Sequence, residues 1–201
     1  MKGIKYLLSD LDGVIRHFSP ERDQEIEQRC GLSSGALLST AFEKGLLTRA
    51  ITGQIPDGTW RSEMVDSLSK IIPSDLAAQA VKDWSDFPGK VDDRYLKYLK
   101  NKFPTLPIAV LTNGTSRLHQ DLTRLGIADR FFKVFNSSEI GFCKPDKSVF
   151  LHVIEALNCK ASEVLFIDDS LSHVNAAKEL GMIVHHYRTF DEFQKSVEAM
   201  A

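Results

Sequence analysis

Two acidic residues stand two positions apart in the segment Leu8-Ser9-Asp10-Leu11-Asp12-Gly13-Val14. The segment follows a short apolar run, and Gly13 permits a turn at this point. One carboxylate can attack phosphorus while it binds a divalent cation, and the other can carry a proton for the departing oxygen. Taken alone, the pattern also fits a solvated turn after a strand.

A hydroxyl-bearing segment, Thr112-Asn113-Gly114-Thr115, follows a second apolar run. A hydroxyl and consecutive backbone N–H groups at the start of a helix form an anion site. The same residues also fit an N-cap of the helix that follows.

Lys144 is the candidate cation of the site, and it directly precedes Pro145. The proline favours an extended backbone at Lys144, so that the ammonium can point toward the carboxylates and a phosphate. A solvated surface lysine is the simpler interpretation of this residue taken singly.

Adjacent acids, Asp168 and Asp169, end a further apolar run. Their like charges repel, and a cation offsets that cost. Because the expected ligands are all oxygen atoms, Mg²⁺ is favoured over a transition metal. Either acid alone also fits a cap of the next helix.

Short apolar runs alternate with amphipathic helical patterns through most of the chain. This alternation predicts an α/β fold, a Rossmann-like parallel sheet with helices on both faces. The strand ends then meet at one edge, where such sheets bind ligands. The predicted strands are Ile4–Leu8, Leu106–Leu111, Phe131–Phe135, Val164–Ile167 and Met182–Val184.

Residues 16–88 interrupt the alternation, because they show only helical patterns and turns. We predict a helical cap, or lid, over 16–88, inserted into a discontinuous catalytic core of residues 1–15 and 89–201. The hinges are expected near Ile15–His17 and Phe87–Gly89. The helices predicted in the lid are Gln24–Cys30, Ser34–Lys44, Thr59–Lys70 and Ser74–Ser85.

The composition is that of an ordinary globular protein, with 43% hydrophobic residues and a formal net charge of −2 over 201 residues. The absence of a basic excess argues against a nucleic-acid partner. No stretch reaches the roughly 20 apolar residues of a membrane span. Three scattered cysteines and the lack of a signal sequence predict a cytoplasmic protein. The composition permits a monomer, and a monomer or weak homodimer is expected.

The four candidate segments, in this order, resemble the four motifs of the haloacid dehalogenase-like (HAD) hydrolase superfamily. The segment Phe166-Ile167-Asp168-Asp169-Ser170, followed by Leu180-Gly181-Met182, is typical of that group. The helical insert resembles its C1 cap, as in the epoxide-hydrolase-like and phosphoglucomutase-like members. The resemblance extends from Asp10 to Gly181.

The resemblance implies roles for the acids. Asp10 is expected to be the nucleophile and a Mg²⁺ ligand, and Asp12 the general acid–base, with its backbone carbonyl on the metal. Asp169 is expected to bind Mg²⁺ directly. Asp168 either binds the ion too or lies just behind the ligands. His173 stands where many relatives have Asp or Asn.

The resemblance also implies a phosphate site. Thr112 is expected to bind the transferring phosphoryl group with the backbone amides of Asn113 and Gly114. Lys144 is expected to neutralise both the nucleophile and the phosphate. Arg16, at the start of the insert, is a candidate contact for the substrate.

The function implied is a Mg²⁺-dependent phosphatase that acts on a small phosphorylated metabolite, such as a sugar phosphate, through an aspartyl-phosphate intermediate on Asp10. A phosphomutase of the same fold shares all four motifs and stays open. A 2-haloacid dehalogenase is disfavoured, because dehalogenases of the family lack the second aspartate, Asp12. A non-catalytic phosphometabolite-binding protein is the remotest alternative.

Overall fold

A parallel sheet of five strands in the order β5-β4-β1-β6-β7 forms the centre of the computed structural model, which describes residues 3–199. The predicted α/β fold is confirmed, and each strand begins and ends within two residues of its predicted bounds. The strands are β1 Tyr6–Ser9, β4 Ile108–Thr112, β5 Lys133–Asn136, β6 Val164–Asp168 and β7 Ile183–His186.

The central strands are continuously apolar because helices cover both faces of the sheet. Leu7 on β1 packs in one core with Tyr95 and Phe193, whereas its neighbour Leu8 packs in the opposite core with Phe150. This follows from the alternation of side chains along a strand. The sheet is therefore fixed from both sides, and its strand ends are held in register.

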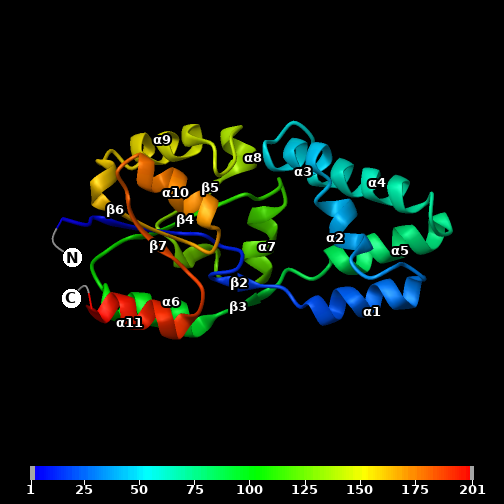
Figure 1. Ribbon diagram of the computed structural model, residues 1–201, viewed down its shortest axis with the longest axis horizontal. Coiled ribbons are helices and arrows are strands. Elements are labelled where there is room, and N and C mark those ends of the chain that lie inside the picture. Colours follow the sequence, from blue (N-terminus) through cyan, green and yellow to red (C-terminus); the bar gives the residue numbers. More distant parts are fainter. Residues whose placement is uncertain (1–2, 200–201) are drawn as a thin grey trace.

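The two faces carry different helices (Figure 1). The first core packs against α6 Asp93–Lys102, α7 Leu118–Arg124 and α11 Phe190–Ala199. The second packs against α9 Lys147–Ala156 and α10 Leu171–Glu179. A short helix, α8 Ser137–Ile140, follows β5, and 3₁₀ turns lie at Ala128–Arg130 and Ala161–Glu163.

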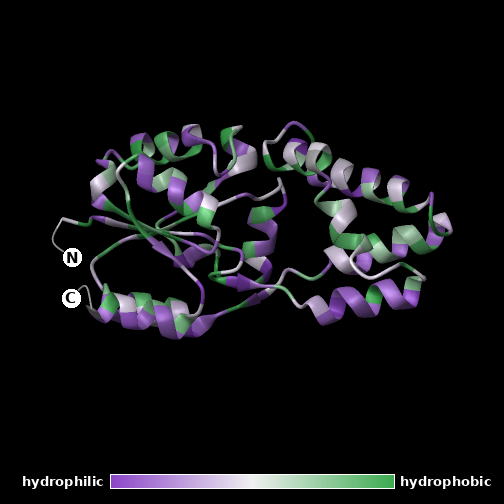
Figure 2. Ribbon diagram, viewed as in Figure 1, coloured by the Kyte–Doolittle hydropathy of each residue, from purple (hydrophilic) through white to green (hydrophobic). Residues whose placement is uncertain are grey.

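Five helices, α1 to α5, lie together beside the sheet and share an apolar core that includes Leu37, Met64 and Leu68 (Figure 1). Figure 2 shows that α1 is mostly hydrophilic along its length, as expected of a helix that faces solvent on one side. Their bounds are α1 Pro20–Cys30, α2 Ala36–Ala41, α3 Lys44–Ile51, α4 Asp57–Leu68 and α5 Ser74–Ser85.

The single helix predicted at Ser34–Lys44 is wrong: α2 ends before Phe42, and α3 begins at Lys44. The backbone of Glu43 is extended, with ψ at 123°, and this breaks the helix. The start of α2 is fixed instead by the buried carboxylate of Glu27, which accepts bonds from the backbone N–H groups of Gly35 and Leu37 at 2.8 and 2.9 Å.

A two-stranded antiparallel ribbon joins the places where the chain leaves and re-enters the sheet region. It consists of β2 Arg16–His17 and β3 Lys90–Val91. The expectation that this part of residues 16–88 holds only helices and turns is wrong at β2, because two residues are too few to show strand alternation. The ribbon ties the two ends of the helical segment together. None of the described helices is long and apolar enough to cross a membrane.

Candidate active site

Three of the predicted residues meet at the carboxyl edge of the sheet. Asp10 directly follows β1, Asp168 ends β6, and Lys144 reaches both from the loop before α9. The Lys144 Nζ lies 2.8 Å from Asp10 Oδ1 and 2.7 Å from Asp168 Oδ2. It also donates to the carbonyl of Leu111 at 3.0 Å. The side chains of Lys144 and Asp168 are 1% and 0% exposed, so this is a buried ion cluster.

Asn113 positions the loop that carries Lys144. Its Nδ2 donates to the Lys144 carbonyl at 2.9 Å, and its Oδ1 accepts from the Lys144 N–H at 2.8 Å. The sequence predicted only the backbone amide of Asn113 as a phosphate ligand. The amide side chain also joins the loop after β4 to the loop before α9.

The pKa values of Lys144, Asp168 and Asp10 are shifted in different directions. Burial alone lowers the pKa of Lys144, but Asp10 and Asp168 outweigh it, and the pKa is raised, so Lys144 stays protonated. Burial raises the pKa of Asp168, but the bonds from His173 and Lys144 bring it down to about 2. Burial raises the pKa of Asp10 well above its ordinary value, because Lys144 offsets it only in part and Asp168 adds repulsion.

His173 belongs to the site, although no role was predicted for this residue. Its Nδ1 lies 3.0 Å from Asp168 Oδ1 and 3.2 Å from Oδ2. The backbone N–H of Ser170 also donates to Asp168 Oδ1 at 2.8 Å. Asp168 is therefore held by Lys144, His173 and its own loop. The signal that could have found His173 is its place on α10, about one turn after Asp168.

Asp12 is bonded by Arg16 rather than left free. The Arg16 Nε lies 2.5 Å from Asp12 Oδ1, and one terminal nitrogen donates to Oδ2 at 2.9 Å. The Asp12 side chain is still 40% exposed, whereas that of Arg16 is 7% exposed. Arg16 thus fixes the orientation of Asp12. Both residues line the cavity described below, and a direct contact of Arg16 with substrate stays a prediction.

Asp169 lies against the turn after Asp10. A side-chain carbon placed on Gly13 would come 2.0 Å from Asp169 Oδ2, and the positive φ of 83° also favours glycine there. Burial and the neighbouring Asp168 raise the pKa of Asp169. The turn that Gly13 permits therefore lets the second acidic motif approach the first.

The donor set of this edge suits Mg²⁺. Three of the four predicted acids, Asp10, Asp12 and Asp168, are bonded by two cationic side chains, Lys144 and Arg16, and the structure gives no ion pair of Asp169 within residues 3–199. Negative charge is left without a protein counter-ion, and two of the acids, Asp10 and Asp169, have raised pKa values. A divalent cation with a preference for oxygen ligands would relieve both effects.

Thr112 and Gly114 flank Asn113 at the same edge. Thr112 ends β4 and is 1% exposed, and its Cα pairs with that of Asn136 on β5. Gly114 has the carboxamide oxygen of Asn136 only 2.9 Å from the position of a side-chain carbon. The backbone after β4 is thus closely packed on β5, which fixes the direction of its N–H groups.

A cavity of about 220 Å³ lies between this edge and helices α1 to α5. Asp12, Asn113 and Gly114 line it from the sheet side, and Leu38, Phe42 and Ile51 are among the residues that line it from the helices. The candidate acid–base residue and the candidate phosphate loop therefore face a common space.

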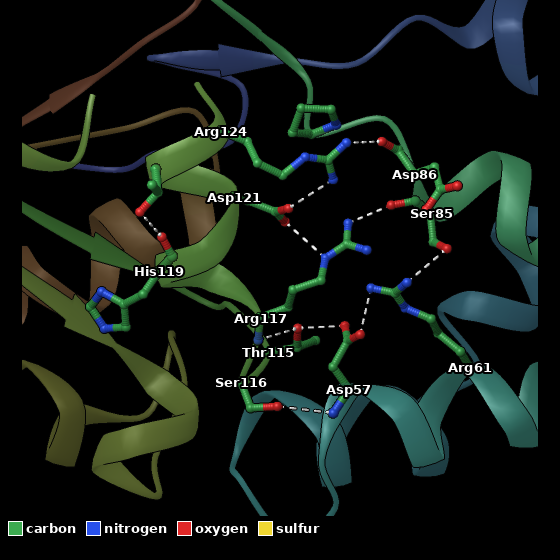
Figure 3. A network of polar contacts seen from close by, with 12 residues as sticks. Asp57, Arg61, Ser85, Asp86, Thr115, Ser116, Arg117, His119, Asp121 and Arg124 are labelled. Carbon is green, nitrogen blue, oxygen red and sulfur yellow. Dashed lines mark hydrogen bonds and ion pairs between the residues drawn. The ribbon is translucent and has the colours of Figure 1, made fainter. Parts of the chain in front are cut away.

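A network of polar contacts connects helices α4 and α5 to the loop after β4 and to α7 (Figure 3). Asp57 Oδ1 accepts a bond from Thr115 Oγ1 at 2.8 Å, and the Asp57 N–H donates to Ser116 Oγ at 3.0 Å. Arg117 donates to the carbonyl of Ser85, and Arg124 to that of Asp86 at 2.6 Å. The helices over the cavity are thereby joined to the segment that follows Thr112.

Comparison with known proteins gives relatives of similar length and of greater length. A D-ribitol-5-phosphate phosphatase of Bacteroides thetaiotaomicron is 24% identical over 89% of this chain and 89% of its own. Bifunctional epoxide hydrolase 2 of Sus scrofa is 25% identical over 94% of this chain, which spans 37% of the length of that relative.

Solved structures share the fold. A HAD family enzyme of Bacteroides thetaiotaomicron, solved with magnesium and inorganic phosphate, has a TM-score of 0.75 at 21% identity, over 95% of this chain and 99% of its own. The family model for haloacid dehalogenase-like hydrolases matches residues 4–181, which include all four candidate segments. The chain therefore belongs to the haloacid dehalogenase-like hydrolases.

Proposed function

We propose that the chain is a Mg²⁺-dependent phosphatase that hydrolyses a small phosphomonoester through an aspartyl phosphate on Asp10. The observation that carries the proposal is the buried bond of Lys144 to both Asp10 and Asp168, with Asp12, two residues after Asp10, lining the neighbouring cavity. A phosphatase among the relatives supports the same reaction class.

The metal would be held by Asp10, Asp169 and the backbone carbonyl of Asp12. Asp168 would act from behind these ligands, because Lys144, His173 and the Ser170 N–H already occupy its oxygens. When bound, Mg²⁺ supplies charge stabilisation for the phosphoryl oxygens and for the carboxylate of Asp10. Lys144 supplies the second positive charge in this region.

In the first step an Asp10 oxygen forms a bond to phosphorus, and the bond from phosphorus to the ester oxygen breaks. Asp12 gives its proton to the departing alkoxide, so that an alcohol leaves. Arg16 holds the Asp12 carboxylate toward the cavity where that oxygen lies. Backbone N–H groups of Asn113 and Gly114, with Thr112 and Lys144, stabilise charge on the phosphoryl oxygens.

In the second step water attacks the phosphorus of the aspartyl phosphate. Asp12, now ionised, takes a proton from this water, and the bond from phosphorus to the Asp10 oxygen breaks. Inorganic phosphate and free Asp10 result, and Asp12 again carries the proton that begins the cycle. Helices α1 to α5, joined to α7, limit the access of bulk water to both steps.

Phosphate release from p-nitrophenyl phosphate and from a panel of small phosphomonoesters tests the proposal. We expect multiple turnovers with Mg²⁺, a loss to background with EDTA, and recovery when Mg²⁺ is added in excess. Turnover that EDTA does not affect would contradict the metal site. A sugar phosphate that is isomerised without phosphate release would indicate a phosphomutase instead.

A further inference from the structure

One part of the cavity wall, from α2, α3 and the segments at Phe18 and Phe87, is built from apolar side chains. It includes Phe18, Leu38, Phe42, Leu47, Ile51 and Phe87. The polar groups that face a phosphate, from Asp12, Asn113 and Gly114, lie on the sheet side. The cavity therefore has a polar end for the phosphoryl group and an apolar end for whatever leaves it.

Three of these apolar side chains stay open to solvent. Phe18, Leu38 and Phe42 are 50%, 38% and 56% exposed, although they line a concave site. Large apolar side chains left open at a concave surface mark a place where a ligand buries them. This exposure favours an apolar group as the occupant.

Three of the four arginines that line the cavity are paired with carboxylates of the protein. Arg16 bonds Asp12, the Arg61 guanidinium lies 2.5 Å from Asp57, and Arg117 Nε lies 3.2 Å from Asp121. Each of these three positive charges is already matched by a carboxylate, so a second anionic group of a substrate would find no unmatched charge among them. A second charge on the leaving group is thus disfavoured.

Arg22 is also held by contacts within the protein. It donates to the carbonyl of Trp84 at 3.2 Å, and its guanidinium lies 5.0 Å from the centre of the Phe87 ring. Among the described residues that line the cavity, Arg61 Nε and Asp121 Oδ1 are the buried side-chain polar atoms without a hydrogen-bond partner. A sugar carries several hydroxyls, and each hydroxyl left without a partner would lose its bonds to water.

We infer that the leaving group is an uncharged, mostly apolar alcohol, held between the phosphate end and the side chains of Leu38, Phe42 and Ile51. This inference rests on the proposed phosphatase function and names its substrate class. It differs from the sugar phosphate that the family resemblance suggests. The cavity of about 220 Å³ equals the liquid volume of about seven water molecules, so the alcohol is small or of medium size.

Substrate pairs matched in carbon number test the inference. Propyl phosphate is compared with glycerol 3-phosphate, and pentyl phosphate with ribitol 5-phosphate. We expect the alkyl ester to have the higher kcat/KM in each pair. From propyl to pentyl, kcat/KM should rise about fourfold for each methylene, the ratio that burial of one methylene provides.

A pair of variants localises the effect. Leu38→Asn should lower kcat/KM for pentyl phosphate about tenfold and flatten the dependence on chain length. Leu76→Asn is the matched control, because Leu76 lies on α5 with 39% exposure and outside the described cavity wall. In Leu76→Asn, kcat/KM should depend on alkyl chain length as it does in the unmodified protein.

The outcomes separate the inference from the proposed function. Higher kcat/KM for the polyol phosphates, or a chain-length dependence unchanged by Leu38→Asn, would overturn the inference and leave the phosphatase intact. If neither the alkyl nor the polyol esters release phosphate, and p-nitrophenyl phosphate does not either, the proposed function fails and the inference fails with it.

Discussion

The Asp10→Asn variant is expected to lower kcat for phosphate release by about 10⁴-fold or more, because the substitution removes the nucleophile on which both steps depend. Asparagine has nearly the same shape, so the cavity and the loop after β1 are retained. The N–H of Leu11, which donates to Asp10 Oδ1 at 2.7 Å, can donate to the amide oxygen instead.

The Asp10→Asn variant should lose activity without losing stability. The pKa of Asp10 is raised in the folded protein by burial and by Asp168, so its ionised form opposes folding at neutral pH. An uncharged asparagine removes that cost, and the thermal midpoint should stay the same or rise. Asp66→Asn, an exposed position on α4, is the control and should keep full activity. Substantial turnover by Asp10→Asn would contradict the mechanism.

Lys144→Met is expected to lower the free energy of unfolding by about 3–5 kcal/mol at neutral pH and to abolish phosphate release. The loss is large because Asp10 and Asp168 are left buried without the ammonium that bonds both. Urea denaturation measures it. Lys147→Met is the control: Lys147 pairs with Glu179 at the surface, where both side chains are more than half exposed, so little change is expected.

The loss of unfolding free energy in Lys144→Met should depend on pH. In the unmodified protein the pKa of Asp168 is lowered from 3.8 to about 2, with His173 and Lys144 as the causes. A lowered carboxylate pKa stabilises the fold above the ordinary value, and this stability is lost as pH falls toward about 2. The difference in unfolding free energy between the unmodified protein and Lys144→Met should therefore narrow as pH falls from 3.8 toward about 2. A deficit below about 1 kcal/mol at neutral pH would show that the buried cluster is not needed.

The sheet and the centre of the site could be predicted from the sequence for one physical reason. Parallel strands covered on both faces are short apolar runs, and their ends meet at one edge. Asp10 and Asp168 follow such runs directly, so their proximity follows from the topology. Lys144 lies in a loop, and its position was inferred from the family resemblance and from Pro145.

Other parts could not be predicted because they depend on contacts between distant segments. The side chain of Asn113 is specified by the backbone of Lys144, 31 residues away. The bond of Asp57 to Thr115 depends on the position of α4 beside the loop after β4. The break between α2 and α3 depends on the backbone of Glu43, whereas the nearest glycine, Gly45, lies inside α3. The apolar wall of the cavity likewise required the packing of the helices.

Chemical trapping of the phosphorylated residue tests the central claim most directly. In Asp12→Asn, the second step loses its base and should slow by about 10²–10⁴-fold. With p-nitrophenyl phosphate, whose leaving group needs little acid assistance, a phosphoryl group should accumulate on Asp10. Acid quench and peptide mass spectrometry should then find it on the peptide that contains Asp10. Phosphate release without any phosphorylated residue, or a phosphoryl group on another side chain, would contradict the account.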